Sequence, residues 1–138
     1  MKELPSNVLE EINQLIAQEE NWLNQLKKSE DELENLQEVL DVYSKHSNLS
    51  EQKSVSHYQN LFNHYRIELI RDMKHHVRIN LQDLRALVTR QPERYYHSYL
   101  NNLQDHSQHV NKFFKYFDKM KQEFREAISY ERLRATAS

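Results

Sequence analysis

The spacing of core-type residues along the first third of the chain constrains the fold more than any other feature. Eleven consecutive positions there alternate steps of four and three residues. This average of about 3.5 residues keeps one side of an α-helix facing a partner and winds the pair left-handed. Residues 96–131 repeat the spacing, so both ends of the chain are predicted to be long, packed helices. The first stripe is Val8, Ile12, Leu15, Glu19, Trp22, Leu26, Ser29, Leu33, Leu36, Leu40 and Tyr43, and the second is Tyr96, Tyr99, Leu103, His106, Val110, Phe113, Phe117, Met120, Phe124, Ala127 and Glu131.

The composition excludes most other fold classes, because the 138 residues include no glycine. Glycine supplies the positive φ angles of hairpin turns, bulges and phosphate-binding loops. The two prolines, Pro5 and Pro92, interrupt no periodic run. We therefore predict an all-α fold without a nucleotide-binding loop.

Three helices are predicted, over residues 6–46, 51–90 and 92–132, with a frayed tail at 133–138. Ser47, Asn48 and Ser50 have side chains that compete for backbone hydrogen bonds and end the first helix, and Pro92 suits a first helical position. Short connections make neighbouring helices antiparallel. We expect residues 1–138 to form one domain, an elongated, spectrin-like up-down-up three-helix bundle with coiled-coil packing. The alternative is a dimer in which these helices share a larger bundle.

The stripe of the middle helix is less regular than the other two, because it contains two pairs of consecutive four-residue steps. Such stutters locally relax the supercoil. A wider apolar face, made by Ile70, Val77, Leu81 and Val88, indicates contact with two neighbours. The predicted stripe is Tyr58, Phe62, Tyr65, Leu69, Met73, His76, Asn80, Leu84 and Leu87.

Charge is distributed unevenly between the predicted helices. Residues 6–46 hold ten acids and three bases, a balance of −7, whereas residues 51–90 and 93–134 carry +3 and +2. We interpret this as an acidic helix beside two basic ones, with complementary flanks fixing the pairing. A basic face for nucleic acid is the less favoured interpretation, because acids and bases alternate.

The chain has no cysteine, and its first residues contain no apolar run of the kind found in signal peptides. No stretch approaches the ~20 apolar residues of a membrane span. We therefore expect a cytoplasmic protein that does not contact a membrane.

Three segments are similar to a group of small, uncharacterised helical bacterial proteins. They are residues 20–26 (ENWLNQL), residues 31–33 (DEL) and residues 57–62 (HYQNLF), the last followed by Met73-Lys74-His75. The resemblance covers roughly residues 20–80 and implies a helical hairpin of bacterial origin. It implies no activity.

Polar residues interrupt the apolar stripes at one predicted height in the bundle. Antiparallel pairing brings Glu19, His76 or Asn80, and His106 together. One interpretation is a buried polar layer that fixes helix register. The other is a metal site formed by Glu19, His76, His106 and His109. We favour the first, since the chain lacks the Glu-x-x-His motif of di-iron bundles, and we predict no cofactor.

Two further apolar edges run beside the stripes. One contains Leu9, Ile16 and Leu23; the other contains Tyr95, Leu100, Phe114 and Ile128. Each edge is either the contact with the third helix within one chain or the face of a homodimer. Because the edges exceed what one narrow seam requires, we predict a homodimer.

These observations favour a protein that acts by association. No strained serine turn, oxyanion loop or metalloprotease motif is present, so we predict no catalytic residue and no enzyme. The first prediction is a helical interaction or scaffold module that binds itself or another protein. The alternatives are a histidine/carboxylate metal-binding bundle and, third, a nucleic-acid-associated protein.

Overall fold

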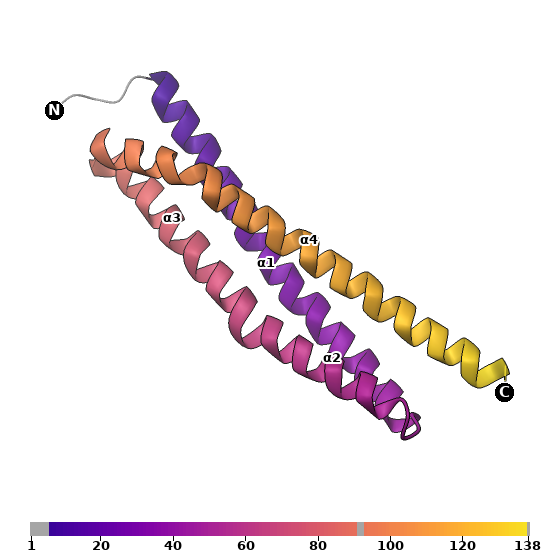
Figure 1. The fold of residues 1–138 in the computed structure, drawn as a ribbon. Coiled ribbons are helices and arrows are strands. Elements are labelled where there is room, and N and C mark those ends of the chain that lie inside the picture. The colour runs from indigo at the N-terminus through magenta and orange to yellow at the C-terminus, as the bar shows by residue number, and fades with distance from the viewer. Residues whose placement is uncertain (1–5, 91–92, 138) are drawn as a thin grey trace.

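The chain is a bundle of three long helical rods (Figure 1). A computed structural model describes the backbone of residues 6–90 and 93–137 and the side chains of residues 6–89 and 96–128. The helices are α1 (Ser6–Lys45), α2 (Gln52–His64), the π-helix η1 (Tyr65–Leu69), α3 (Ile70–Arg90) and α4 (Glu93–Ala137). No strand occurs in the described backbone, and the all-α prediction is confirmed.

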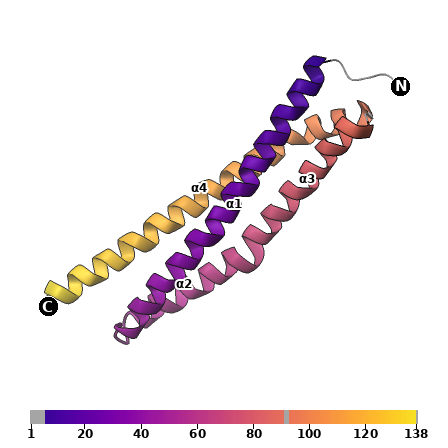
Figure 2. The ribbon, with the colours of Figure 1, turned by 180° about the vertical axis from the view of Figure 1, so that it is seen from behind.

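The rods lie side by side along their length (Figures 1 and 2). The second rod consists of α2, η1 and α3 in direct succession, and it runs back along α1. The last rod, α4, runs in the direction of α1. The backbones of α1 and α3 approach each other more closely than either approaches α4. Bulky aromatic side chains separate α4 from the other two helices, among them Phe113, Phe117 and Phe124.

The helix ends agree closely with the predicted ones at the first turn. The Oδ1 atom of Asn48 accepts hydrogen bonds from the backbone N–H of Glu51 at 3.0 Å and from the hydroxyl of Ser50 at 2.6 Å. These local bonds offer the backbone an alternative to the helix, and α1 ends at Lys45. The predicted helix start at Pro92 lies outside the described residues.

The last helix extends beyond its predicted end at residue 132, and the fraying of residues 133–138 stays a prediction. Helix α4 continues to Ala137. No glycine or proline follows Pro92, so nothing in this segment breaks the backbone hydrogen-bond ladder. Alanine and arginine are also among the stronger helix formers.

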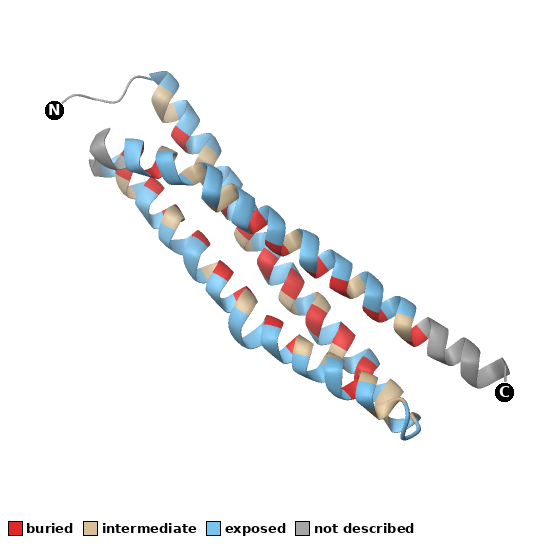
Figure 3. Cartoon of the chain, viewed as in Figure 1, coloured by how far each residue is buried: buried red, intermediate tan, exposed pale blue. Residues whose placement is uncertain are grey.

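The core follows the predicted stripes of α1 and α4 (Figure 3). All eleven positions of the first stripe are buried or half-buried, as are the ten described positions of the second. The buried residues form two clusters. One spans most of the bundle and contains Trp22, Leu33, Phe62, Val77 and Phe117; the smaller one contains Ile12, Leu84, Leu87, Tyr96 and Tyr99. The polar residue Glu19, which belongs to neither cluster, occupies the stripe between Ile12 and Trp22.

The middle rod departs from its predicted stripe at the first stutter. There the helix forms the π-turn η1, in which the backbone N–H of Ile70 bonds to the carbonyl of Tyr65, five residues earlier. The extra residue shifts the inward face, and Ile70 and Val77 are fully buried. His76 is consequently exposed. Its predicted place in the core stripe is wrong.

The acidic flanks of α1 pair with bases on both other rods, as the charge distribution predicts. Each pair joins a glutamate of α1 to a lysine or arginine of α3 or α4. Such pairs favour one arrangement of neighbours even where each contributes little stability. They are Glu20 with Arg85 at 2.9 Å, Glu30 with Lys74 at 2.5 Å, and Glu32 with Lys121. In the described part of the chain, no helix combines the length and apolar character needed to cross a bilayer.

Candidate functional site

Glu19 is the most unusual side chain of the core. It stands at a stripe position of α1, and its exposed fraction is 0%. A carboxylate taken out of water is costly unless hydrogen bonds replace the lost hydration. The groups that supply these bonds therefore define the first candidate site.

Two residues of α4 donate to Glu19. The hydroxyl of Tyr99 donates to Oε1 at 3.0 Å, and Nε2 of His106 lies 2.9 Å from Oε1 and 3.1 Å from Oε2. Tyr99 and His106 are seven residues apart, so they share one face of the helix. Since a carboxylate only accepts hydrogen bonds, the contacting nitrogen of His106 carries the hydrogen.

The surroundings of this cluster favour the protonated form of Tyr99. Burial raises the pKa of Tyr99, and the nearby charge of Glu19 and the hydrogen bond to it raise it further. The phenol therefore remains a donor across the physiological range. The ring of Trp22 meets that of His106 edge-on, with 5.4 Å between the centroids, and covers it.

This cluster is suited to fixing how α1 and α4 lie beside each other. Its three polar residues satisfy one another inside the bundle. The grooves between α3 and α4 and between α1 and α4 are lined by other residues, so neither leads a substrate to Glu19. We refer to Glu19, Tyr99 and His106 as the inner layer.

The structure does not bring the remaining predicted layer residues into this cluster. His76 is exposed and Asn80 is half-buried. His109, one turn after His106, is exposed and lies with His76 in the groove between α3 and α4. Among the described residues, no group of three or more His, Cys, Asp or Glu side chains could hold a metal ion.

The predicted interface residues pack within the chain. Leu9, Ile16 and Leu100 contact the smaller cluster, whereas Leu23 and Phe114 contact the larger one. Two predicted interface residues remain. Ile128 is buried, with 8% exposure, and the side chain of Tyr95 lies outside the described residues. Apart from Tyr95, these residues therefore contact the core of their own chain, and their role in a homodimer stays a prediction.

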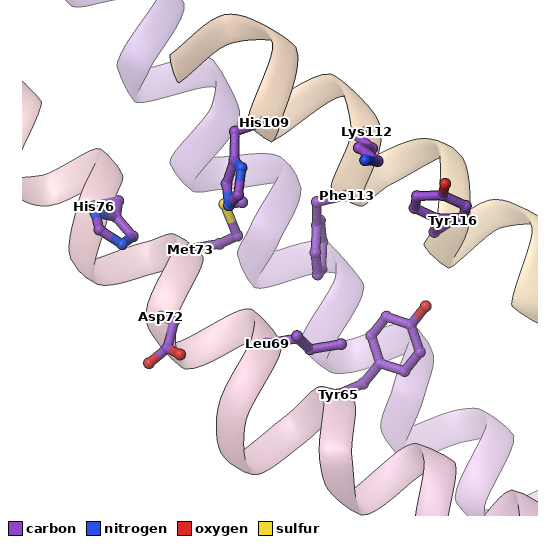
Figure 4. A pocket seen from close by; sticks show the side chains of 9 residues that line it. All are labelled: Tyr65, Leu69, Asp72, Met73, His76, His109, Lys112, Phe113 and Tyr116. Atoms are coloured by element: carbon purple, nitrogen blue, oxygen red, sulfur yellow. The ribbon is translucent and has the colours of Figure 1, made fainter. Parts of the chain in front are cut away.

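A groove between η1/α3 and α4 forms the second candidate site (Figure 4). Its volume is about 360 Å³, within the usual range of about 300–1,000 Å³ for binding pockets. Its nine lining residues include five with large apolar side chains. They are Tyr65, Leu69, Asp72, Met73, His76, His109, Lys112, Phe113 and Tyr116.

The π-turn shapes one wall of this groove. The step from Tyr65 to Ile70 places both residues in the core and leaves Leu69 half-buried at the groove. Single π-turns within α-helices frequently occur at functional sites. The π-turn, an irregularity of the backbone, therefore lies at the wall of the groove.

Across the groove, the wall formed by α4 exposes a large aromatic ring. Tyr116 is 52% exposed, and the ammonium of Lys112 lies 5.8 Å from the centroid of its ring. Tyr116 belongs to no predicted stripe. The groove therefore ends in an amphipathic rim, the type of surface that is enriched at protein interfaces.

Sequence reasoning missed the donor role of Tyr99 and the groove itself. The signal for Tyr99 was its place one heptad before His106, at a position opposite the only acid in the α1 stripe. No pattern in the sequence signalled the groove, because it depends on how far α4 stands from α3.

Comparison with family models, curated proteins and solved structures gave no match to this chain.

Proposed function

We propose that the protein acts without catalysis, as an interaction module that binds a helix of a partner in the groove between η1/α3 and α4. The bundle would serve as the rigid support of this groove. We further propose that its packing is that of a spectrin-like coiled coil, in which the outer groove can accept one more helix.

The observation that carries the proposal is the apolar groove beside the exposed Tyr116. Two adjacent helices form a trough into which a third amphipathic helix fits, with anchors at positions i, i+3 or i+4, and i+7. Met73 and Phe113 contribute apolar surface to the floor, whereas Asp72 and Lys112 are polar and exposed. This arrangement of apolar centre and polar rim is typical of a docking surface.

Metal binding and nucleic-acid binding have less support in the described side chains. Glu19 and His106, two of the four residues of the metal alternative, are bonded to each other in the core. The four residues of the metal alternative are divided between the inner layer and the groove. For nucleic acid, the groove offers one lysine and one aspartate, which is not the basic stripe that phosphate contacts require.

A designed helical peptide tests the proposal. The peptide has about 20 residues, leucines at i, i+3 or i+4 and i+7, and a fluorescent label read by anisotropy. We expect saturable micromolar binding, weakened about tenfold or more by Tyr116→Glu, because a charge then enters the apolar contact. The matched control is Ile67→Glu, since Ile67 is 55% exposed, lies on η1 and does not line the groove.

Equal loss of binding in both variants, or no loss in either, would contradict the proposal. The absence of cysteine allows a single-cysteine variant, His109→Cys, to carry a cross-linker in the groove while Tyr116 is kept. Cross-linking to the apolar stripe of the peptide then confirms the place of binding.

The homodimer is a separate proposal, in which a second copy would supply the helix. Light scattering at high micromolar concentration tests it. We expect a dimer mass that Tyr116→Glu reduces toward the monomer. Phe114→Glu is unsuitable for this purpose, because Phe114 packs against the core cluster and its replacement would also destabilise the fold.

A further inference from the structure

We infer that the partner helix has one acidic and one basic flank, and that the groove fixes the direction in which this helix lies. The inference rests on the proposed function and adds the chemistry of the partner. It is drawn from the opposite charges on the two walls.

The two walls of the groove carry different polar residues. Asp72 and His76 lie on α3, whereas His109 and Lys112 lie on α4 (Figure 4). Asp72 and Lys112 are both exposed, and neither has an ion pair with another described residue. One wall therefore offers a carboxylate, the other an ammonium, and both are available to a helix between them.

The charge difference continues along each rod. Glu68 lies one turn before Asp72, and Lys119 lies two turns after Lys112. Their existing pairs are with His64 at 3.0 Å and Glu123 at 4.0 Å, on exposed surfaces. Exposed pairs of this kind exchange partners at little cost. Charges of the same sign therefore occur on each rod beyond the groove, although Glu68 and Lys119 do not line it.

On the inner side of the bundle, charged residues on the two flanks of α1 form ion pairs with the neighbouring helices. Helix α1 meets Lys74 of α3 through Glu30 and Lys121 of α4 through Glu32. There both neighbours are basic and the seated helix is acidic on both flanks. The outer groove differs, since a helix seated in it meets Asp72 on one side and Lys112 on the other.

This difference in charge between the two walls determines in which direction the partner helix lies along the groove. Turning a helix end to end in a groove exchanges its two flanks. For a helix with a basic and an acidic flank, one direction pairs opposite charges on both walls and the other direction pairs like charges on both. We expect the favoured direction to dominate by about tenfold at low salt, because the two orientations differ by two favourable and two unfavourable surface pairs.

The experiment compares three peptides that share one apolar stripe. The first has lysines on one flank and glutamates on the other, the second has glutamates on both, and the third has lysines on both. A nitroxide at the peptide N-terminus broadens nearby protein signals, with the methyl groups of Leu69 and Ile79 as reporters of the two directions. The matched variant carries Asp72→Lys together with Lys112→Glu, which exchanges the wall charges.

We expect the mixed peptide to bind about threefold or more tighter than either uniform peptide, in agreement with the magnitude of exposed ion pairs. Broadening should affect one reporter in the natural chain and the other reporter in the charge-exchanged variant. If all three peptides bind equally and remain sensitive to Tyr116→Glu, or if both reporters broaden alike, the inference is wrong and the proposed function stands. If no peptide shows binding that depends on Tyr116, the proposed function fails as well.

Discussion

The inner layer and the outer groove contain the same kinds of side chain, but these side chains differ in their exposure and in their hydrogen bonding. Each contains a carboxylate, a histidine of α4 and a tyrosine of α4. In the inner layer, Glu19 is fully buried and both donors bond to it. In the groove, Asp72, His109 and Tyr116 are exposed. Satisfied polar groups stabilise a unique arrangement, whereas exposed groups beside an apolar surface are available for binding.

The largest effect is expected when the inner layer loses its acceptor. Replacing Glu19 with leucine leaves Tyr99 and His106 without their buried partner, so we expect a loss of about 3 kcal/mol in the free energy of unfolding. Urea denaturation measures it. The control is Glu20→Leu, which removes a half-exposed pair with Arg85 and should cost less than about 1 kcal/mol. Equal effects of the two substitutions would show that the inner layer has no special role.

Removing the whole inner layer should be tolerated better than removing Glu19 alone. We expect the triple variant Glu19→Leu, Tyr99→Phe, His106→Leu to be as stable as the natural chain or more stable by about 1–4 kcal/mol, because no buried polar group then lacks a partner. The measurement is the same urea titration. A triple variant less stable than Glu19→Leu would indicate that packing shape, and not hydrogen bonding, governs this position.

Alkaline pH should weaken the inner layer through Tyr99. Its pKa is raised in the folded chain above the ordinary tyrosine value of 10.0, so the folded state holds the phenolic proton more tightly than the unfolded state. The resulting stability is complete below pH 10 and decreases as the pH rises above that value. We expect the natural chain to lose about 1.4 kcal/mol per pH unit relative to Tyr99→Phe. Parallel stability curves above pH 10 would contradict this account.

The smallest effect is expected from metal ions. Added zinc should leave the melting temperature of the natural chain unchanged, since the four residues of the metal alternative are divided between the inner layer (Glu19, His106) and the groove (His76, His109). A ligand that binds only the folded state would raise that temperature by mass action. A reproducible rise that disappears in the inner-layer triple variant would establish the metal-binding alternative.

The stripes of α1 and α4 made most of the core predictable. Their heptad spacing is regular, so each position has one possible orientation, and the structure brings Glu19 to His106 as the antiparallel pairing predicted. Tyr99 was assigned to the core correctly, but its bond to Glu19 depends on a side-chain conformation that spacing does not determine.

The middle rod could not be predicted to the same accuracy. Apolar residues occur in adjacent pairs there, such as Leu69 and Ile70, so the sequence permits two faces that differ by one residue. The π-turn selects Ile70 and Val77 for the core and exposes His76. The groove could not be predicted from the sequence either, because its width depends on the aromatic side chains that separate α4 from α3.

The most direct test of this account compares the two sites in one binding measurement. The designed peptide is titrated against the natural chain, Tyr116→Glu and the inner-layer triple variant, and the stability of each is measured alongside. We expect Tyr116→Glu to bind about tenfold more weakly while its stability stays within about 0.5 kcal/mol of the natural chain, because Tyr116 is largely exposed. The triple variant should keep its full affinity. Loss of binding in the triple variant, with Tyr116→Glu unaffected, would contradict the assignment of structure to the inner layer and of binding to the groove.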